Sequence, residues 1–282
     1  MELESFDMEK GEGKRIPSAG RCIYCGDDQS DLTDEHVIPY ALGGNTVIFE
    51  KACCIPCQRL IQPYEQRFLR GQLGVYRTRI DAPTRRRRDR PTHKRLHFIE
   101  VDDRGQYLRD LCTREFPVAD TPLAFSVWDL APPRILGEGA SEAQHIGRPW
   151  TYVQRELAMK LAAEVGQETK AKHVAVRVDE INRADFLRFL AKMAHAFAVS
   201  EQGVDAFKPL ATSLILGKSD DLAQFVGGDS GPNPHEKDPA NMVELTIGKI
   251  IDGPVSGHTA VRIRLYPLLG TPAHVVVVGA PN

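Results

Sequence analysis

Two Cys-x-x-Cys pairs constrain the first part of this chain more than any other feature. Cys22 and Cys25 form the first pair, and Cys54 and Cys57 form the second. A gap of two residues lets both thiolates of a pair turn toward one ion, and structural zinc binds four such ligands in a tetrahedron. We therefore predict one structural Zn²⁺ that joins the two pairs and encloses a short hairpin. Cys53 is a rival ligand, but only Cys54 keeps the two-residue gap to Cys57.

A metal is favoured over a disulfide if the thiols stay reduced. The first 20 residues are polar and mixed in charge, and they lack the apolar core of a signal peptide. No stretch approaches the roughly 20 apolar residues that span a bilayer. We therefore expect a cytoplasmic protein with no membrane contact, in which paired cysteines bind metal.

The net charge of −2 conceals a strong local asymmetry. Residues 51–95 contain thirteen Lys and Arg against three acidic residues. Five of these arginines stand between two prolines: Arg85, Arg86, Arg87, Arg88 and Arg90. A local positive excess is typical of a surface that contacts a polyanion, and contacts to phosphates would be independent of base sequence. A solvated loop without a partner and a nuclear-targeting mimic are the alternatives.

The segment between the cysteine pairs predicts a hairpin followed by a helix. Val37–Ile38 and residues 46–49 are β-branched or aromatic and predict its two strands. Pro56 suits the first turn of a helix, where its missing N–H costs nothing. We expect Pro63 to interrupt this helix and to begin a second one that ends near Leu73. The result is a ββα unit held together by zinc.

The remainder of the chain predicts an α+β domain with an antiparallel sheet. Thr151 and Gln154 form a capping-box pattern that predicts a helix start. Asn182 caps a long helix that ends near Gly203, because the apolar residues after it recur at helical spacing. Period-two alternation and β-branched runs predict strands at about 96–101, 106–111, 173–178, 242–251, 259–267 and 273–279.

We divide the chain into three parts on these patterns. Residues 1–18 are expected to be a disordered tail, because they are polar and rich in glycine. Residues 19–95 form the zinc-clipped unit with its arginine-rich segment. Residues 96–282 form the α+β domain, whose role the patterns do not indicate.

Three motifs stand in one order along residues 20–75. They are Glu35-His36-Val37-Ile38-Pro39, then Leu42-Gly43-Gly44, then Ala52-Cys53-Cys54-Ile55-Pro56-Cys57-Gln58. This combination resembles the zinc-containing branch of the HNH endonuclease family. The resemblance implies a metal-dependent endonuclease that hydrolyses DNA, with RNA left open as a substrate. It also implies that His36 polarises the attacking water, while Glu35 and Gln58 hold a catalytic Mg²⁺ or Mn²⁺.

The chemistry of the residues agrees with that implication. Hydrolysis of a phosphodiester at neutral pH needs a deprotonated water and a cation that neutralises charge on the phosphate. Histidine suits the role of base, because an imidazole with a pKa of about 6.5 is largely neutral at that pH. A carboxylate beside it is the hard oxygen ligand that Mg²⁺ prefers.

One departure from the family pattern leaves alternatives open. Gln58 stands where the family has Asn, so its amide oxygen sits on a longer and less constrained stem. Asp34 and Glu65 are spare carboxylates, and Asn45 is a candidate for the middle Asn of the family. The first alternative is therefore a zinc-clipped nucleic-acid-binding module without catalysis. The second is an interaction protein whose basic segment binds an acidic partner.

Two further expectations rest on analogy, and one alternative concerns His36. Homodimerisation through the C-terminal domain is an open possibility. A gated effector in defence or in a mobile element is a role that fused nucleases often have. His36 as an ordinary structural histidine is the plain alternative to its catalytic role.

Overall fold

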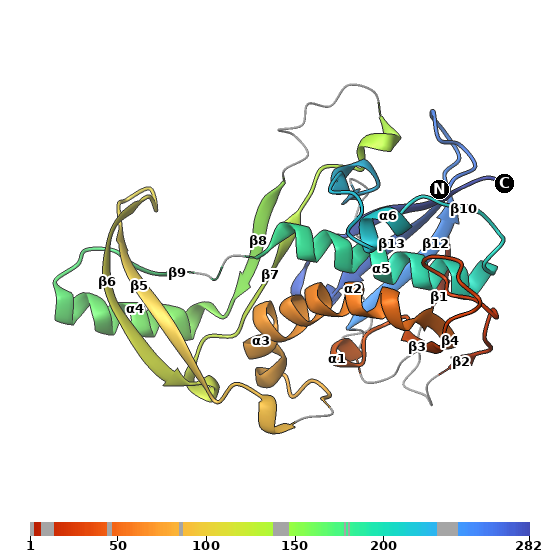
Figure 1. The fold of residues 1–282 in the computed structure, drawn as a ribbon. Helices are drawn as coiled ribbons and strands as arrows, with labels where there is room; N and C mark the ends of the chain where they lie inside the picture. Colours follow the sequence, from red (N-terminus) through yellow and green to blue (C-terminus); the bar gives the residue numbers. More distant parts are fainter. Residues whose placement is uncertain are drawn as a thin grey trace.

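A long helix lies in the middle of the molecule, between a C-terminal sheet and the cysteine-rich N-terminal unit (Figure 1). The computed structural model describes residues 3–6, 14–43, 47–84, 87–137, 147–177, 179, 181–229 and 242–282. Helices and antiparallel sheets are both present, which confirms the predicted α+β class. No helix in these ranges is long and apolar enough to cross a membrane.

The N-terminal unit is a three-stranded sheet with a helix following its hairpin. Its elements are β2 (Arg15–Ile16), β3 (Leu32–His36), α1 (Tyr40–Gly43), β4 (Ile48–Cys54) and α2 (Ile55–Gln66). β3 and β4 pair antiparallel, with a bulge after Thr33, and β2 runs parallel to β4. The predicted hairpin is therefore present, but the first strand ends at His36. Val37 and Ile38 follow it as buried bend residues, so their apolar character reflects burial in the core.

The helix that starts at the second cysteine pair is longer than predicted. α2 runs through Pro63 to Gln66 and continues as the π-helix η1 (Arg67–Gln72), before α3 (Gly74–Arg79). The expectation that Pro63 starts a new helix is wrong. A proline removes one backbone hydrogen bond from a helix. Here the buried side chains of Ile61, Tyr64 and Phe68 keep the helix packed on the core across that gap.

The C-terminal sheet has six strands and is antiparallel throughout. Its strands are β1 (Leu3–Phe6), β10 (Lys208–Pro209), β11 (Val226–Gly228), β12 (Val243–Lys249), β13 (Thr259–Leu265) and β14 (His274–Ala280). The order is β1-β12-β13-β14-β10, and β11 also pairs with β14. The three strands predicted near the C-terminus are confirmed. β1 and β2 both come from the segment expected to be a disordered tail, and each joins a sheet.

Helix α5 (Arg183–Gln202) connects these two parts. The Asn182 side chain accepts a hydrogen bond from the Asp185 backbone N–H at 2.9 Å, and the helix stops before Gly203, whose φ of 94° suits glycine. Both predicted ends are thus confirmed. α5 contacts β13 and β14 as well as α2 and the short α6 (Thr212–Ile215). A helix in contact on several sides is expected to be apolar around its circumference.

The apolar core is continuous from the N-terminal unit to the C-terminal sheet. The ring of Phe68 lies 5.4 Å from that of Phe186 and 4.6 Å from that of Phe189. One cluster of buried side chains includes residues of the cysteine pairs, of α5 and of β14. A domain boundary near residue 95 remains a prediction from the sequence, and packing alone does not separate the two sides.

A smaller lobe extends away from this body (Figure 1). It contains β5 (His93–Val101), β6 (Tyr107–Pro117), β9 (Val174–Arg177) and α4 (Arg155–Thr169). Leu96, Phe98, Leu161 and Val165 form its own buried cluster. The ribbon of β7 (Ala124–Asp129) and β8 (Arg148–Val153) precedes α4.

The predicted capping box at Thr151 is wrong. Thr151 belongs to β8, and its hydroxyl lies 3.0 Å from that of Ser126 on β7. The helix begins only at Arg155, after Gln154, which makes no side-chain cap. Cross-strand pairing with β7, which is distant in sequence, outweighs the local capping pattern here.

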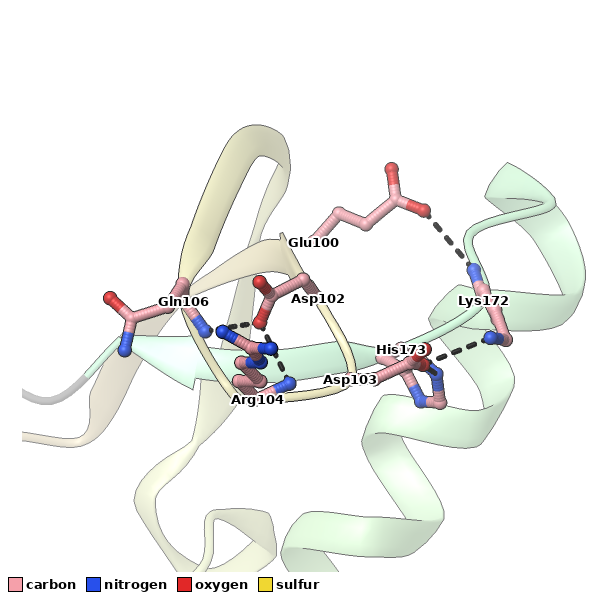
Figure 2. A network of polar contacts seen from close by, with 7 residues as sticks. All are labelled: Glu100, Asp102, Asp103, Arg104, Gln106, Lys172 and His173. Carbon is pink, nitrogen blue, oxygen red and sulfur yellow. Dashed lines mark hydrogen bonds and ion pairs between the residues drawn. The ribbon is translucent and has the colours of Figure 1, made fainter.

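A polar network closes the tip of the lobe (Figure 2). The Asp102 carboxylate accepts hydrogen bonds from the backbone N–H groups of Arg104 and Gln106, both at 2.8 Å. Asp103 contacts the Lys172 ammonium at 2.9 Å and His173 Nε2 at 2.7 Å. The predicted β5–β6 turn is confirmed. Exposed pairs of this kind add little stability, so their effect is to fix the turn against the start of β9.

Short 3-10 segments complete the described structure. They are η2 (Arg87–Asp89), η3 (Val118–Asp120), η4 (Arg134–Leu136), η6 (Leu222–Gln224) and η7 (Pro267–Leu269).

The buried His274 predicts a pH dependence of stability. Its Nε2–H donates to the Trp128 carbonyl at 2.7 Å, and burial lowers the pKa of His274 to about 4. As the pH falls from about 6.5 to about 4, His274 therefore binds a proton in the unfolded chain but not in the folded chain. We expect this residue to remove about 2 kcal/mol from the free energy of unfolding between pH 7 and pH 5.

Denaturant unfolding at pH 5 and pH 7 measures this effect. The His274→Gln variant should lose less stability over this range than the wild type. The exposed His97 gives the control variant His97→Gln, which should follow the wild-type pH dependence. Equal pH dependence in wild type and His274→Gln would contradict the assignment.

Candidate active site

The four predicted zinc ligands converge. The Sγ atoms of Cys22, Cys25, Cys54 and Cys57 all lie within 4.8 Å of one another, and Cys25 and Cys54 are 3.6 Å apart. A tetrahedral zinc with Zn–S bonds of about 2.3 Å separates its sulfurs by about 3.8 Å. The four sulfurs therefore come together as predicted, and their spacing fits a Zn²⁺.

Each cysteine pair is presented by a different local structure. After Cys25, the backbone N–H of Gly26 donates to the Cys22 carbonyl at 2.8 Å, and Gly26 takes a φ of 78°. The second pair stands where β4 ends and α2 begins, so Cys57 lies in the first turn of the helix. Burial raises the pKa of both Cys54 and Cys57. A bound dication would offset this cost by stabilising the thiolates.

Cys53 lies beside the cluster and is outside it. It is buried, and the Cys54 carbonyl at 3.5 Å is one of two acceptors, with Cys22, for its single S–H. A hydrogen bond from Cys53 lowers the pKa of Cys22 to about 4. Cys53 therefore supports a ligand of the cluster, in agreement with the spacing argument that chose Cys54.

The three residues predicted to act in catalysis line one cavity of about 430 Å³. Glu35 and His36 end β3, and Gln58 lies in the first turns of α2. Glu35 is only 7% exposed, His36 is half-buried and Gln58 is exposed. His36 therefore lies at the cavity wall, and the Nδ1 atom of its imidazole is buried. The cysteine cluster joins the turn at Cys22–Cys25, which precedes β3, to the start of α2, and this connection helps to bring these residues together.

The two spare carboxylates have different environments. Because α2 is continuous through Pro63, Glu65 lies two helical turns beyond Gln58 and lines the same cavity. Asp34 also reaches the cavity wall. However, its carboxylate pairs with Arg15 at 3.0 Å and accepts the Lys51 backbone N–H at 3.1 Å. Glu65 is therefore the better additional metal ligand.

Lys192 belongs to this site, although the sequence analysis did not identify it. It lies on α5 and is 1% exposed. Its ammonium pairs with Glu35, lies 3.3 Å from a Glu65 oxygen, and donates to the His36 carbonyl at 2.7 Å. Burial by itself lowers the pKa of Lys192, but Glu35 and Glu65 outweigh it and raise that pKa, so the group is charged. The sequence could have indicated this residue, because it is a lysine within the apolar run of residues 189–199. Buried lysines are almost always paired with another group.

The arginine-rich segment is only partly described. Arg85 and Arg86 lie outside the described residues, as do Gly44, Asn45 and the side chain of Arg87. Arg88 is exposed on η2. Arg90 lines the cavity and contacts the Asp81 carboxylate and the Ala82 carbonyl.

Two arginines outside that segment also line the cavity. Arg70 is exposed there, on the π-helix η1. Arg77 donates to the carbonyls of Ala41, Leu69 and Pro83 at 2.8 to 3.1 Å, so it serves to hold the loops together. Arginines and the carboxylates Glu35 and Glu65 therefore line the same cavity.

Comparison with protein families identifies the N-terminal unit. Residues 22–71 match the model of the HNH endonuclease family. This match confirms the resemblance over that segment and supports a nuclease-type hydrolase that acts on nucleic acid. No curated protein and no solved structure matches the chain.

The cysteine cluster predicts that one zinc per chain supports the fold. We expect Cys54→Ser to lose the bound zinc and to destabilise the protein strongly, because the binding energy of a structural zinc contributes to folding. Metal analysis and thermal unfolding measure both effects. Cys53→Ser is the matched control, which should keep its zinc. Retention of zinc in Cys54→Ser, or its loss in Cys53→Ser, would contradict the ligand assignment.

Proposed function

We propose that this protein is a metal-dependent HNH-type endonuclease that hydrolyses DNA phosphodiester bonds. The observation that carries the proposal is the meeting of Glu35, His36 and Gln58 at one cavity, beside the four-cysteine cluster. All of these residues lie within the segment that matches the HNH endonuclease family. RNA has the same phosphodiester chemistry and is the alternative substrate.

The donor set at the cavity fits an oxygen-seeking divalent ion. Glu35 and Glu65 offer carboxylate oxygens and Gln58 offers an amide oxygen, which are ligands that Mg²⁺ and Mn²⁺ accept. We assign Glu35 and Gln58 as the protein ligands, with Glu65 as an additional one. When bound, the ion neutralises charge on the scissile phosphate and on the leaving oxygen.

His36 then acts as the general base. Its imidazole takes a proton from the water that attacks phosphorus. Because Nδ1 is buried, we assign this step to Nε2.

Basic residues around the cavity would bind the nucleic acid. Arg70 and Arg88 are exposed near the site, and we extend this role to Arg85, Arg86, Arg87 and Arg90. Each contact would be made to phosphates, so binding should weaken steeply as salt rises. Cytoplasmic location, dimerisation and a role in defence or in a mobile element stay predictions.

A binding module without catalysis is the second candidate, and Gln58 is the observation that favours it. Gln has one methylene group more than Asn, so the amide oxygen of Gln58 lies farther from the backbone that carries it. Under this alternative, the protein binds DNA with the same salt dependence but cuts it with neither Mg²⁺ nor Mn²⁺.

The first test is cleavage of supercoiled plasmid DNA with Mg²⁺ or Mn²⁺. We expect nicking or cleavage by the wild type and a loss of about 10²- to 10⁴-fold in His36→Ala, the usual contribution of a general base. His97→Ala, on the exposed face of β5, should cut like the wild type. Full activity of His36→Ala would remove this residue as the base.

The second test concerns Gln58. If its amide binds the ion, Gln58→Ala should need at least about tenfold more Mn²⁺ for half-maximal cleavage, a loss of about 1.4 kcal/mol. Gln106→Ala, at the tip of the lobe, is the control (Figure 2). An inactive wild type whose activity appears only in Gln58→Asn would favour the binding module. An unchanged Mn²⁺ requirement in Gln58→Ala would show that this amide is not a ligand.

A further inference from the structure

A buried ammonium already occupies the acidic side of the candidate active site. Lys192 Nζ has three oxygen partners: a Glu35 carboxylate oxygen, a Glu65 carboxylate oxygen at 3.3 Å, and the His36 carbonyl at 2.7 Å. A lysine ammonium has three N–H donors, so these partners can satisfy all of them. The surroundings of this ammonium are those of a cation site built from oxygen ligands.

Removing either the ammonium or a carboxylate from this arrangement would lower the stability of the protein. A buried charge without a partner destabilises a protein strongly, whether it is the ammonium or a carboxylate. Glu35 is 7% exposed and Lys192 is 1% exposed, so solvent screens their interaction weakly. The buried Glu35 carboxylate is therefore stabilised by a positive charge next to it, and in this structure Lys192 supplies that charge.

A divalent ion at Glu35 would meet the same requirement. Two cations near one carboxylate repel each other, and this repulsion is strong where little water is present. A divalent ion bound to Glu35 and Glu65 would therefore weaken or displace the contact with Lys192.

We propose that Lys192 is a built-in competitor of the divalent ion, and that it holds Glu35 and Glu65 until the ion displaces it. This inference rests on the proposed function, because it assigns these carboxylates to the ion. α5 packs against β13 and β14 of the C-terminal sheet. The C-terminal part of the chain thereby sets the metal affinity of the N-terminal unit, which makes Lys192 an autoinhibitory contact.

The experiment measures Mn²⁺ binding by calorimetry on the zinc-loaded full chain, without nucleic acid. We expect Lys192→Met to bind Mn²⁺ at least tenfold more tightly than the wild type, because both carboxylates lose their competitor. Its melting temperature should also rise more with Mn²⁺ than that of the wild type. Lys172→Met, at the tip of the lobe, is the matched control and should bind Mn²⁺ like the wild type (Figure 2). Equal or weaker Mn²⁺ binding by folded Lys192→Met would overturn the proposal.

A second measurement uses the wild type, in case Lys192→Met fails to fold. A buried, hydrogen-bonded ammonium exchanges its protons slowly, so Lys192 should give a protected ¹⁵N signal in a lysine-labelled sample. Titration with Mg²⁺ should shift that signal or expose it to exchange, as the ion takes its partners. A protected signal that stays unchanged after Mg²⁺ titration would overturn the proposal.

These readouts separate the two claims. Tighter Mn²⁺ binding by Lys192→Met, together with no cleavage by any variant, would support competition between Lys192 and the ion and would contradict the proposed nuclease activity. Cleavage by the wild type, with Mn²⁺ binding unaffected by Lys192→Met, would support the nuclease activity and contradict the competition.

Discussion

The convergence of four cysteine sulfurs is the constraint on which the site depends. It joins a tight turn near the N-terminus to the start of α2, with the hairpin strands β3 and β4 between them. Short strands and one helix bury too little apolar surface to hold such a unit rigid on their own. With the cluster formed, the end of β3 and the first turns of α2 face the same cavity, and the candidate catalytic residues meet there.

Helix α5 is the second support, and it reaches the N-terminal unit at two points. His195 is buried, and its Nε2–H donates to the Ile23 carbonyl inside the first cysteine pair at 2.8 Å. One turn earlier, Lys192 pairs with Glu35. The same helix thus braces the cysteine cluster and places a charge in the candidate active site. Since α5 also packs on the C-terminal sheet, the nuclease-like unit and the rest of the chain share one core.

Local patterns predicted those elements whose causes are local. The Asn182 cap, the Gly203 stop and the alternating C-terminal strands follow from neighbours a few residues away, and all were confirmed. Predictions failed where a distant partner decided the outcome. Pro63 stays inside a helix because buried side chains hold it on the core. Thr151 is in a strand because β7 pairs with it.

The sequence by itself determined the chemistry: four thiols at ligand spacing, a carboxylate next to an imidazole, and an amide after the last cysteine. These are properties of residue type and short spacing, so they are visible without a fold. Only the tertiary structure decided what surrounds the carboxylate. Lys192 and His36 are 156 positions apart in sequence, and no local pattern relates them. Their contact exists because burying α5 between two apolar surfaces brings its one lysine against Glu35, where an unpaired charge of either sign would be unstable.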